Sequence, residues 1–321
     1  MKKQIKISVI GMGYVGLPLA LEFGSKYTTI GFDLNKTRIE LLNKNIDSNN
    51  EISKREFKKS KNTTFSNNID DIKNSDYFIV CVPTPIDNSK KPNLENLKNA
   101  SKIVGKVISS NNIVIYESTV YPGVTENICI PIIERISKLN IIKKDKKNKN
   151  GFYCGYSPER INPGDKKRKI KDIVKIVSGS NKFALNKIDK LYKSIIKAGT
   201  CRVDSIKIAE AAKVIENVQR DVNIALVNEF AKIFEKDQIN TNKVIEAAST
   251  KWNFVKYFPG LVGGHCIGVD PFYLSFRAKQ LGINPKMILA GRETNDKMYL
   301  HFYKLIISLI KLKKINLSKS N

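Results

Sequence analysis

The amino-acid sequence predicts an α/β protein, in which a doubly wound parallel sheet is followed by a mainly helical domain. Two observations indicate this. Short runs of β-branched and aromatic residues alternate with helical patterns through the first two hundred residues, an order typical of parallel sheets. After Val203 the alternation stops, and Ile206 to about Lys236 carries apolar residues at helical spacing, with neither glycine nor proline.

The elements of the first domain are expected in alternating order. Seven segments are predicted as strands: Ile5–Ile10, Thr28–Asp33, Tyr77–Val82, Ile113–Glu117, Phe152–Tyr156, Lys175–Ser178 and Thr200–Val203. Four are predicted as helices: Val15–Phe23, Leu94–Ile108, Val124–Ser137 and Asn181–Ala198. Lys143–Asn150 and Gly164–Lys169 are expected to be solvated loops.

The helix from Ile206 would be much longer than average, which is typical of a link between domains or a subunit interface. We therefore expect a first domain over residues 1–204, a central helical domain over 205–300, and the start of a linker over 301–321. The late apolar stretch Leu300–Leu317 is interrupted by lysines and is too short to span a bilayer, so an amphipathic surface helix is expected and membrane insertion is not.

Composition is ordinary except for charge. Hydrophobic residues make up 41% and charged residues 27% of the 321 residues, as in soluble globular proteins. The net charge is +26, but the lysines are spread along the chain among abundant Asn and Ile. This indicates a compositional bias, and no nucleic-acid-binding motif accompanies the charge, so nucleic acid is not an expected partner.

Cysteine usage points to a reducing compartment. The five cysteines are odd in number, widely spaced and never arranged as CxxC, which favours neither a disulfide framework nor a zinc site. They are Cys81, Cys129, Cys154, Cys201 and Cys266. Met1 leads directly into a strand-like segment without a secretory leader, so a cytoplasmic location and no bound metal are expected.

A glycine-rich turn follows the first predicted strand and opens the first predicted helix. Gly11, Gly13 and Gly16 have the spacing GxGxxG, with Tyr14 and Val15 between them. One glycine suits a tight turn, one lets the backbone approach a pyrophosphate, and one allows close helix–strand packing. The helix N-terminus adds free N–H groups and a favourable dipole for phosphate. The turn therefore indicates a Rossmann-type dinucleotide site.

An acidic residue closes the second predicted strand. Asp33 is placed to accept hydrogen bonds from the adenosine ribose and to repel a 2′-phosphate, which favours NAD over NADP. Lys36 and Arg38 lie close by and would soften that preference. The alternative is a structural turn followed by a strand-end aspartate.

Six motifs resemble one family closely, the UDP-glucose/GDP-mannose dehydrogenases, and they run in that family's order along nearly the whole chain. They are Val9–Pro18 (VIGMGYVGLP), Val82–Pro85 (VPTP), Glu117–Val120 (ESTV), Ser157–Arg160 (SPER), Glu210–Asn217 (EAAKVIEN) and Gly263–Asp270 (GGHCIGVD). The segments Ser157–Asp165 and Thr250–Tyr273 look like the branch that oxidises UDP-N-acetylhexosamines for Vi-type polysaccharide.

The resemblance implies three domains: an NAD-binding Rossmann domain, a central helical domain that dimerises and contributes to catalysis, and a C-terminal UDP-binding domain. The chain stops at Asn321, where the linker to the third domain would begin, so that domain is expected to be absent. UDP binding by this chain alone is therefore open, and a separately encoded UDP-binding segment is one possible partner besides a second copy of the chain.

The resemblance also implies a chemistry, in which a sugar C6 alcohol becomes a carboxylate by two hydride transfers to two NAD molecules. An aldehyde loses hydride readily only after a nucleophile has made it tetrahedral. Cys266 matches the family's nucleophile, giving a thiohemiacetal and then a thioester. It precedes a helix predicted over Pro271–Leu281, whose N-terminus would lower the thiol pKa. Asp270 is expected as the N-cap of that helix and, by resemblance, beside the cysteine in catalysis.

Other residues take their roles from the matching motifs. Lys213 and Asn217 are four apart and share a helix face, where they would stabilise an oxyanion at C6. Glu159 would act as general base toward water, or else pair with Arg160 as a loop glutamate. The Thr119 hydroxyl would bind the cofactor or a water, and Thr84 would line the cofactor site. His265 is expected to be structural.

Three alternatives remain open. The first is a truncated, non-catalytic NAD-binding scaffold of the same family. The second is an enzyme that oxidises UDP-glucose, and the gluco or galacto configuration of an N-acetylhexosamine is not decided. A generic hydroxyacid dehydrogenase would share the Rossmann domain and the Lys–Asn helix but would not need Cys266.

Overall fold

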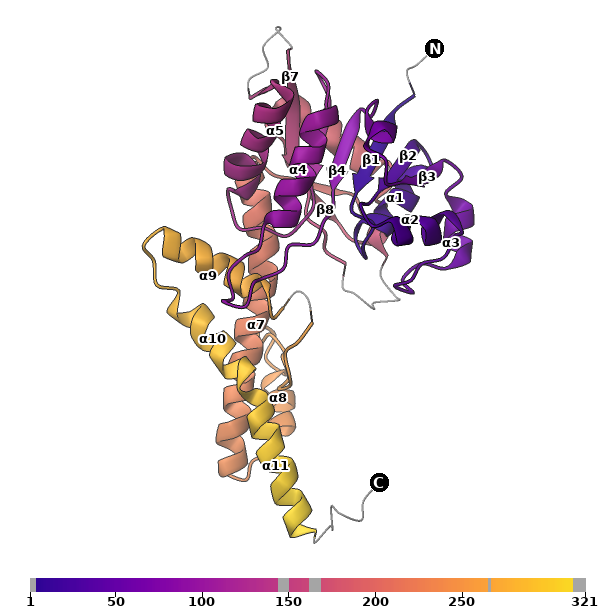
Figure 1. The fold of residues 1–321 in the computed structure, drawn as a ribbon. Coiled ribbons are helices and arrows are strands. Elements are labelled where there is room, and N and C mark those ends of the chain that lie inside the picture. The colour runs from indigo at the N-terminus through magenta and orange to yellow at the C-terminus, as the bar shows by residue number, and fades with distance from the viewer. Residues whose placement is uncertain (1–3, 144–149, 162–168, 265–266, 314–321) are drawn as a thin grey trace. The chain divides into compact units, whose positions relative to one another are not determined.

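The computed structural model describes residues 4–143, 150–161, 169–264 and 267–313. The chain divides into two compact units, Met1–Lys213 and Val214–Asn321, and each is described by itself (Figure 1).

The first unit is built on a seven-stranded parallel sheet with strand order β3-β2-β1-β4-β5-β7-β6. The strands are β1 (Lys6–Ile10), β2 (Thr28–Phe32), β3 (Thr63–Ser66), β4 (Tyr77–Val80), β5 (Ile113–Tyr116), β6 (Asn140–Ile141) and β7 (Gly151–Tyr156). The strand order changes direction between β1 and β4, which opens a crevice at the carboxyl ends of the strands. The doubly wound sheet expected from the sequence is confirmed.

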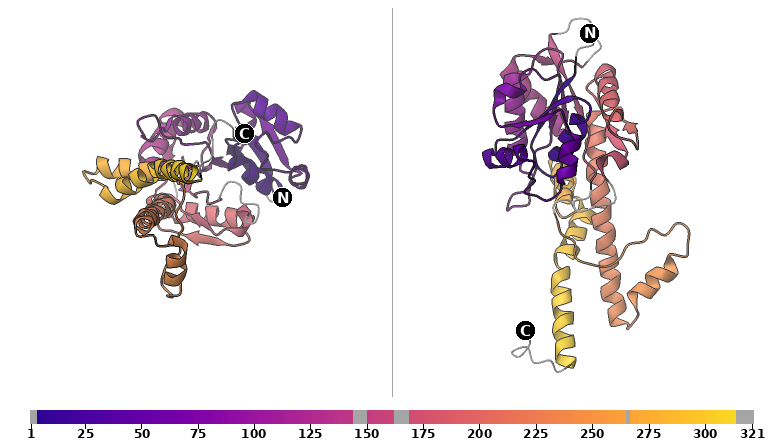
Figure 2. Two further views of the ribbon diagram at one scale, coloured as in Figure 1. Left: turned by 90° about the horizontal axis from the view of Figure 1, so that it is seen from below. Right: turned by 90° about the vertical axis from the view of Figure 1, so that its right-hand side faces the viewer.

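Helices cover both faces of this sheet (Figure 2). They are α1 (Gly16–Gly24), α2 (Lys36–Asn43), α3 (Lys54–Lys59), α4 (Glu95–Val107), α5 (Ile130–Ser137) and α6 (Lys182–Lys193), with the short 3₁₀ helices η1 (Ile69–Ile72) and η3 (Ile170–Asp172) and the π-helix η2 (Thr125–Cys129). Successive residues of β5 show the two layers. Ile115 belongs to the apolar cluster formed with α1 and α6, whereas the Tyr116 hydroxyl lies 2.7 Å from Ser101 Oγ of α4.

Two predicted strands lie outside the main sheet. β8 (Lys175–Val177) and β9 (Thr200–Arg202) form their own two-stranded parallel sheet. The free edge of β7 beyond its pairing with β6 is bonded irregularly, because the amides of Ser178 and Ser180 donate to the carbonyls of Tyr156 and Cys154. This leaves no regular ladder through which β8 would join the seven strands.

The regular secondary structure of the second unit is helical in its described residues, as the sequence predicts, and a non-helical segment over 249–264 follows α8. It contains most of α7 (Ile206–Lys236), followed by α8 (Thr241–Ala248), α9 (Asp270–Gln280), α10 (Lys286–Asp296) and α11 (Met298–Leu312). α7 is a single helix of 31 residues with the predicted limits. Within the described ranges, no helix is both long and apolar enough to cross a bilayer.

Buried polar side chains join α7 to α10. Asp221 is fully buried, and its Oδ1 lies 2.6 Å from Arg292 Nη1 and accepts from Asn295 Nδ2 at 2.8 Å. Asn295 Oδ1 in turn accepts from Asn228 Nδ2 at 2.9 Å. Since a buried guanidinium without its counter-charge is costly, the register of these two helices depends on Asp221.

We predict that Asp221→Ala lowers the free energy of unfolding by about 3–5 kcal/mol, because Arg292 is left buried without its main partner. Asp296 offers a matched control, since it pairs with the same guanidinium but its side chain is 40% exposed. Asp296→Ala should cost no more than about 1 kcal/mol in urea unfolding. Equal losses in the two variants would contradict this account.

Candidate functional site

The glycine turn after β1 has a geometry that requires its glycines. Gly11 has φ +97°, in the left-handed region that disfavours side chains. A Cβ added at Gly16 would stand 1.8 Å from the carbonyl oxygen of Gly11, so α1 packs directly on the turn. Gly13 differs, because a Cβ there would meet nothing within 4 Å. Its missing side chain leaves open space.

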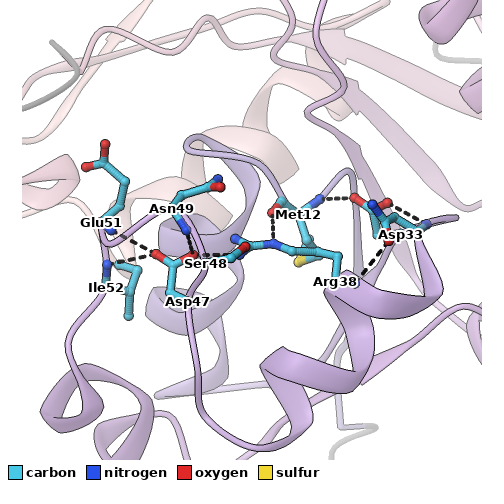
Figure 3. Close-up of polar contacts among 9 residues, drawn as sticks. Met12, Asp33, Arg38, Asp47, Ser48, Asn49, Glu51 and Ile52 are labelled. Atoms are coloured by element: carbon cyan, nitrogen blue, oxygen red, sulfur yellow. Dashed lines mark hydrogen bonds and ion pairs between the residues drawn. The ribbon is translucent and has the colours of Figure 1, made fainter.

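That open space belongs to a cavity of about 660 Å³ at the carboxyl ends of β1, β2 and β4. The cavity is lined by the glycine turn, by residues 32–35 at the end of β2 and by Val82 and Pro83 beyond β4. Asp33 projects into this region (Figure 3): its Oδ2 accepts from the amide of Met12 at 2.8 Å and its Oδ1 from the amide of Asn35 at 2.9 Å. These bonds fix the carboxylate beside the turn.

The residues of this cavity fit a dinucleotide. It lies at the switch point of the sheet, its glycine turn leads into α1, and no side chain caps the N-terminus of α1. Gly11 and Gly13 line the cavity beside Asp33, whose carboxylate oxygens are acceptors of the kind that a ribose requires.

Two threonines expected near the cofactor come together at the same edge of the sheet. Thr84 Oγ1 donates to the carbonyl oxygen of Thr119 at 2.7 Å, and Ser118 Oγ donates to that of Val82 at 2.6 Å. The loops after β4 and β5 are thus tied to each other. Thr84 and Thr119 do not line the cavity that holds Asp33.

Glu159 lies in a buried charge cluster after β7. Its Oε1 accepts from the amides of Arg160 and Ile161 at 2.6 and 2.7 Å, and its Oε2 lies 3.3 Å from Lys175 Nζ. Lys175 is also 2.6 Å from Glu117 Oε2, and the Tyr192 hydroxyl donates to Glu117 Oε1. Glu159 thus pairs with Lys175, while Arg160 donates its backbone amide to Glu159 and its Nη1 to the Val174 carbonyl.

One cation faces two carboxylates in this cluster. Burial raises the pKa of Glu117 to about 7, with Lys175 opposing and Glu159 adding to the shift. Burial alone would lower the pKa of Lys175, but the two carboxylates raise it above its ordinary value. Near neutral pH the cluster thus holds a charged lysine and a glutamic acid that gains and loses its proton. The sequence reasoning missed Lys175, because a lysine inside a short strand carries no motif.

The polar residues of α7 have defined surroundings. Glu210, left unassigned from the sequence, is fully buried and accepts from the amides of Gly123 and Thr125 at 2.5 and 2.9 Å. Burial raises the pKa of Glu210 to about 7. Lys213 and Asn217 are both buried, at 7% and 6% exposure, so neither is an ordinary surface residue.

Asp270 does not cap α9, contrary to the prediction. Val269 occupies the N-cap position without a side-chain hydrogen bond, and Asp270 is the first helical residue. Its carboxylate is buried, and Oδ2 accepts from Asn217 Nδ2 at 2.5 Å. The side chain turns toward α7 because that amide offers a buried hydrogen-bond donor.

The expected nucleophile Cys266 and its neighbour His265 lie outside the described residues. Cys81, Cys129 and Cys154 are buried, and burial raises the pKa of each thiol. Cys201 is exposed. Among the described residues no group of His, Cys, Asp and Glu is arranged to hold a metal ion.

Comparison with known families agrees with this geometry. Residues 5–196 match the NAD-binding domain of the UDP-glucose/GDP-mannose dehydrogenase family, and residues 207–297 match the central domain of that family. The chain belongs to the UDP-glucose/GDP-mannose dehydrogenase family. It is thus an NAD-dependent oxidoreductase of the nucleotide-sugar dehydrogenase type.

Individual relatives cover both domains. The chain is 52% identical over 296 residues to UDP-N-acetyl-D-glucosamine 6-dehydrogenase of Pseudomonas aeruginosa, a match that spans 92% of this chain and 68% of that protein. It is 49% identical to the Salmonella typhi protein of the same name, over 99% of this chain and 73% of the relative. The structure of a UDP-D-ManNAc dehydrogenase from Pyrococcus horikoshii has a TM-score of 0.86 at 32% identity, covering 97% of this chain and 73% of that one.

The glycine turn yields a paired prediction. Gly13→Ala should leave the free energy of unfolding within about 0.5 kcal/mol of wild type, while the methyl group occupies the space for the pyrophosphate and raises the Kd for NAD about tenfold or more. Gly16→Ala should instead lower stability by about 1–3 kcal/mol, because α1 must move off the turn. Calorimetric NAD titration and urea unfolding check both, and a Gly13→Ala protein with unchanged NAD affinity would refute the placement.

The raised pKa of Glu117 yields a second prediction. Its folded pKa of about 7 exceeds the ordinary 4.5, so the folded state binds the extra proton and stability falls as pH rises from 4.5 to 7. The protonation of Glu117 thus contributes about 3 kcal/mol to the free energy of unfolding at pH 4.5, and this is lost as the pH rises to 7. Glu117→Gln should flatten this slope in urea unfolding at a series of pH values, leaving the part due to Glu210. Glu40→Gln, an exposed change on α2, serves as control, and a slope unaltered by Glu117→Gln would disprove the linkage.

Proposed function

We propose that the protein oxidises the C6 alcohol of a UDP-N-acetylhexosamine, UDP-GlcNAc or UDP-GalNAc, to the uronic acid with NAD. The observation that carries the proposal is the 52% identity, across both domains, to a protein named UDP-N-acetyl-D-glucosamine 6-dehydrogenase. The cavity with Gly13 and Asp33 supplies a place for the cofactor.

The proposed reaction balances over two oxidations. The alcohol first loses two electrons and two protons and becomes an aldehyde. The Cys266 thiolate then adds to the carbonyl carbon, and loss of two further electrons converts the thiohemiacetal to a thioester. Water cleaves the thioester to a carboxylate and returns the thiolate. When bound, NAD would supply the hydride acceptor for both oxidations, so that one sugar, two NAD and one water balance against one carboxylate, two NADH and three protons.

The surroundings of Asn217, Asp270 and Lys213 support roles beside Cys266. A hydrogen bond from Asn217 to Asp270 fixes the carboxylate four residues beyond the cysteine in sequence. Lys213 is buried one turn away on α7, and no hydrogen bond to its ammonium is found within the described part of the chain. We infer that Lys213 and Asn217 stabilise the oxyanion at C6 and that Asp270 orients the attacking water.

Glu159 and Thr119 are the proposed contributors from the first unit. Glu159 is held by two backbone amides and by Lys175, so its carboxylate has a fixed direction and a compensated charge. A fixed carboxylate suits a general base that takes a proton from water during thioester cleavage. The Thr119 carbonyl anchors Thr84, and its hydroxyl is proposed to contact the cofactor or a water.

The proposal extends to assembly and setting. We propose a first domain over residues 1–204, a central domain over 205–300 and a homodimer formed through α7. The proposal also includes a cytoplasmic location and a role in surface polysaccharide synthesis. Leu226, Phe230 and Ile233 on one side of α7 are 48%, 38% and 50% exposed, which supports a subunit interface there. UDP binding by this chain, alone or with a separate UDP-binding segment, is part of the same proposal.

The test measures NADH and uronic acid formed from UDP-GlcNAc and UDP-GalNAc. We expect two NADH per sugar and no acid from Cys266→Ser, with Cys201→Ser as the matched thiol control that turns over normally. A ratio of one NADH per sugar, or normal acid formation by Cys266→Ser, would remove the thioester scheme. If NAD binds in calorimetry but neither UDP-sugar does, the chain is a non-catalytic scaffold and the proposal fails.

A further inference from the structure

A buried ion pair lies at the wall of the dinucleotide cavity. Arg38 on α2 lines the cavity and is 8% exposed, and the side chain of its partner Asp47 is 1% exposed. Arg38 Nη1 and Asp47 Oδ1 are 2.7 Å apart. A pair buried this far beside a ligand site affects the charge that a ligand meets.

Asp47 also folds the loop that follows it. Its Oδ1 accepts from the amide of Asn49 at 3.1 Å, and its Oδ2 accepts from the amides of Glu51 and Ile52 at 2.9 and 3.0 Å (Figure 3). With the bond from Arg38, four donors converge on one carboxylate. Burial raises the pKa of Asp47, but these hydrogen bonds outweigh it and leave the pKa below its ordinary value.

The same contacts immobilise Arg38. Its Nε donates to the Met12 carbonyl at 3.0 Å, and Nη1 donates to Asp47 and to Ser48 Oγ at 2.9 Å (Figure 3). Only Nη2 is buried without a hydrogen-bond partner in the part of the chain described. The guanidinium therefore cannot turn the two-nitrogen fork that binds a phosphate toward the cavity without breaking bonds to Asp47 or Met12.

We propose that Asp47 is a positioning residue that sets the dinucleotide selectivity of the cavity, by neutralising Arg38 and holding its guanidinium away from the 2′-phosphate of NADP. The proposal rests on the cofactor cavity and not on the identity of the sugar. It differs from the expectation that Arg38 would weaken the preference for NAD, which stays untested. Arg38 carries the right charge to do so, but Asp47 cancels that charge and occupies one edge of the guanidinium.

The electrostatic reason is a difference between two ligands. The 2′-phosphate of NADP carries a charge of about −1.5 to −2, where NAD has a neutral hydroxyl. Changing the charge of the pair therefore changes the affinity for NADP much more than that for NAD. Loss of order in the loop after Asp47, by contrast, lowers the affinities for NAD and NADP by similar factors. The ratio of the two dissociation constants thus separates a selectivity role from a purely structural one.

The test is a double-mutant cycle on Kd(NADP)/Kd(NAD), measured by calorimetry on the full chain. Asp47→Asn should lower the ratio about tenfold, because an uncompensated guanidinium attracts the phosphate. Arg38→Met should raise it about tenfold, because Asp47 is left as a second anion beside Asp33. The double variant Arg38→Met/Asp47→Asn should return the ratio to within about threefold of wild type.

Glu51→Gln is the matched control, since it removes one negative charge from the same loop but only its backbone amide contacts Asp47. Its ratio should equal that of wild type. A ratio unchanged in Asp47→Asn, or a double variant that does not return toward wild type, would overturn the proposal. Should Asp47→Asn fail to fold, Arg38→Met still decides it, and an unchanged ratio in that variant would overturn the proposal. Failure of wild type to bind NAD would instead refute the cofactor site itself.

Discussion

The contact between helix α1 and the turn that precedes it places the remaining parts of the cofactor cavity. A Cβ added at Gly16 would lie only 1.8 Å from the carbonyl oxygen of Gly11. The glycine at position 16 therefore lets the helix begin immediately over the end of β1. This close approach aims the N-terminus of α1 at the crevice where the strand order changes direction. The Met12 amide is then in reach of Asp33, and the Met12 carbonyl in reach of Arg38.

The first unit contains two buried charge clusters, and they differ in their charge balance. Arg38 and Asp47 balance each other one to one, and the aspartate takes three more backbone donors, so the pair is electrically closed. Lys175 faces both Glu117 and Glu159, which leaves one carboxylate in excess, and burial together with the charge of Glu159 raises the pKa of Glu117 to about 7. The balanced Arg38–Asp47 pair orders its loop and, in our proposal, sets the preference between NAD and NADP. The cluster around Lys175 instead contains a carboxyl group that exchanges a proton near neutral pH.

Most strands of the first unit and its glycine turn could be predicted, because the sequence patterns that mark them are local. Short runs rich in β-branched and aromatic residues mark β1, β4 and β5, and the glycine spacing marks the turn. Two of the strands that were not predicted carry weak signals: β3 is a mostly polar strand of four residues, and β6 has two residues whose pairing depends on β7. β8 and β9 have strand-like sequences, but whether they join the main sheet depends on the free edge of β7, which no local pattern reveals.

Local sequence patterns also fail to predict the hydrogen-bond partners of several side chains. Asp270-Pro271 has the local pattern of a helix start, yet a donor 53 residues earlier, Asn217, takes the carboxylate. Glu159 precedes Arg160 in sequence but bonds to Lys175. Asp47 carries no motif, and only the folded loop shows four donors around it. Long-range donors of this kind decide where a carboxylate points, and spacing along the chain does not encode them.

A crystal structure of the chain with NAD bound tests the central claim most directly. The account predicts the pyrophosphate over Gly13, the adenosine ribose hydroxyls bonded to the Asp33 carboxylate, and the thiol of Cys266 facing the nicotinamide ring. A dinucleotide bound away from the glycine turn, or a Cys266 thiol enclosed in packed side chains remote from the nicotinamide, would contradict it.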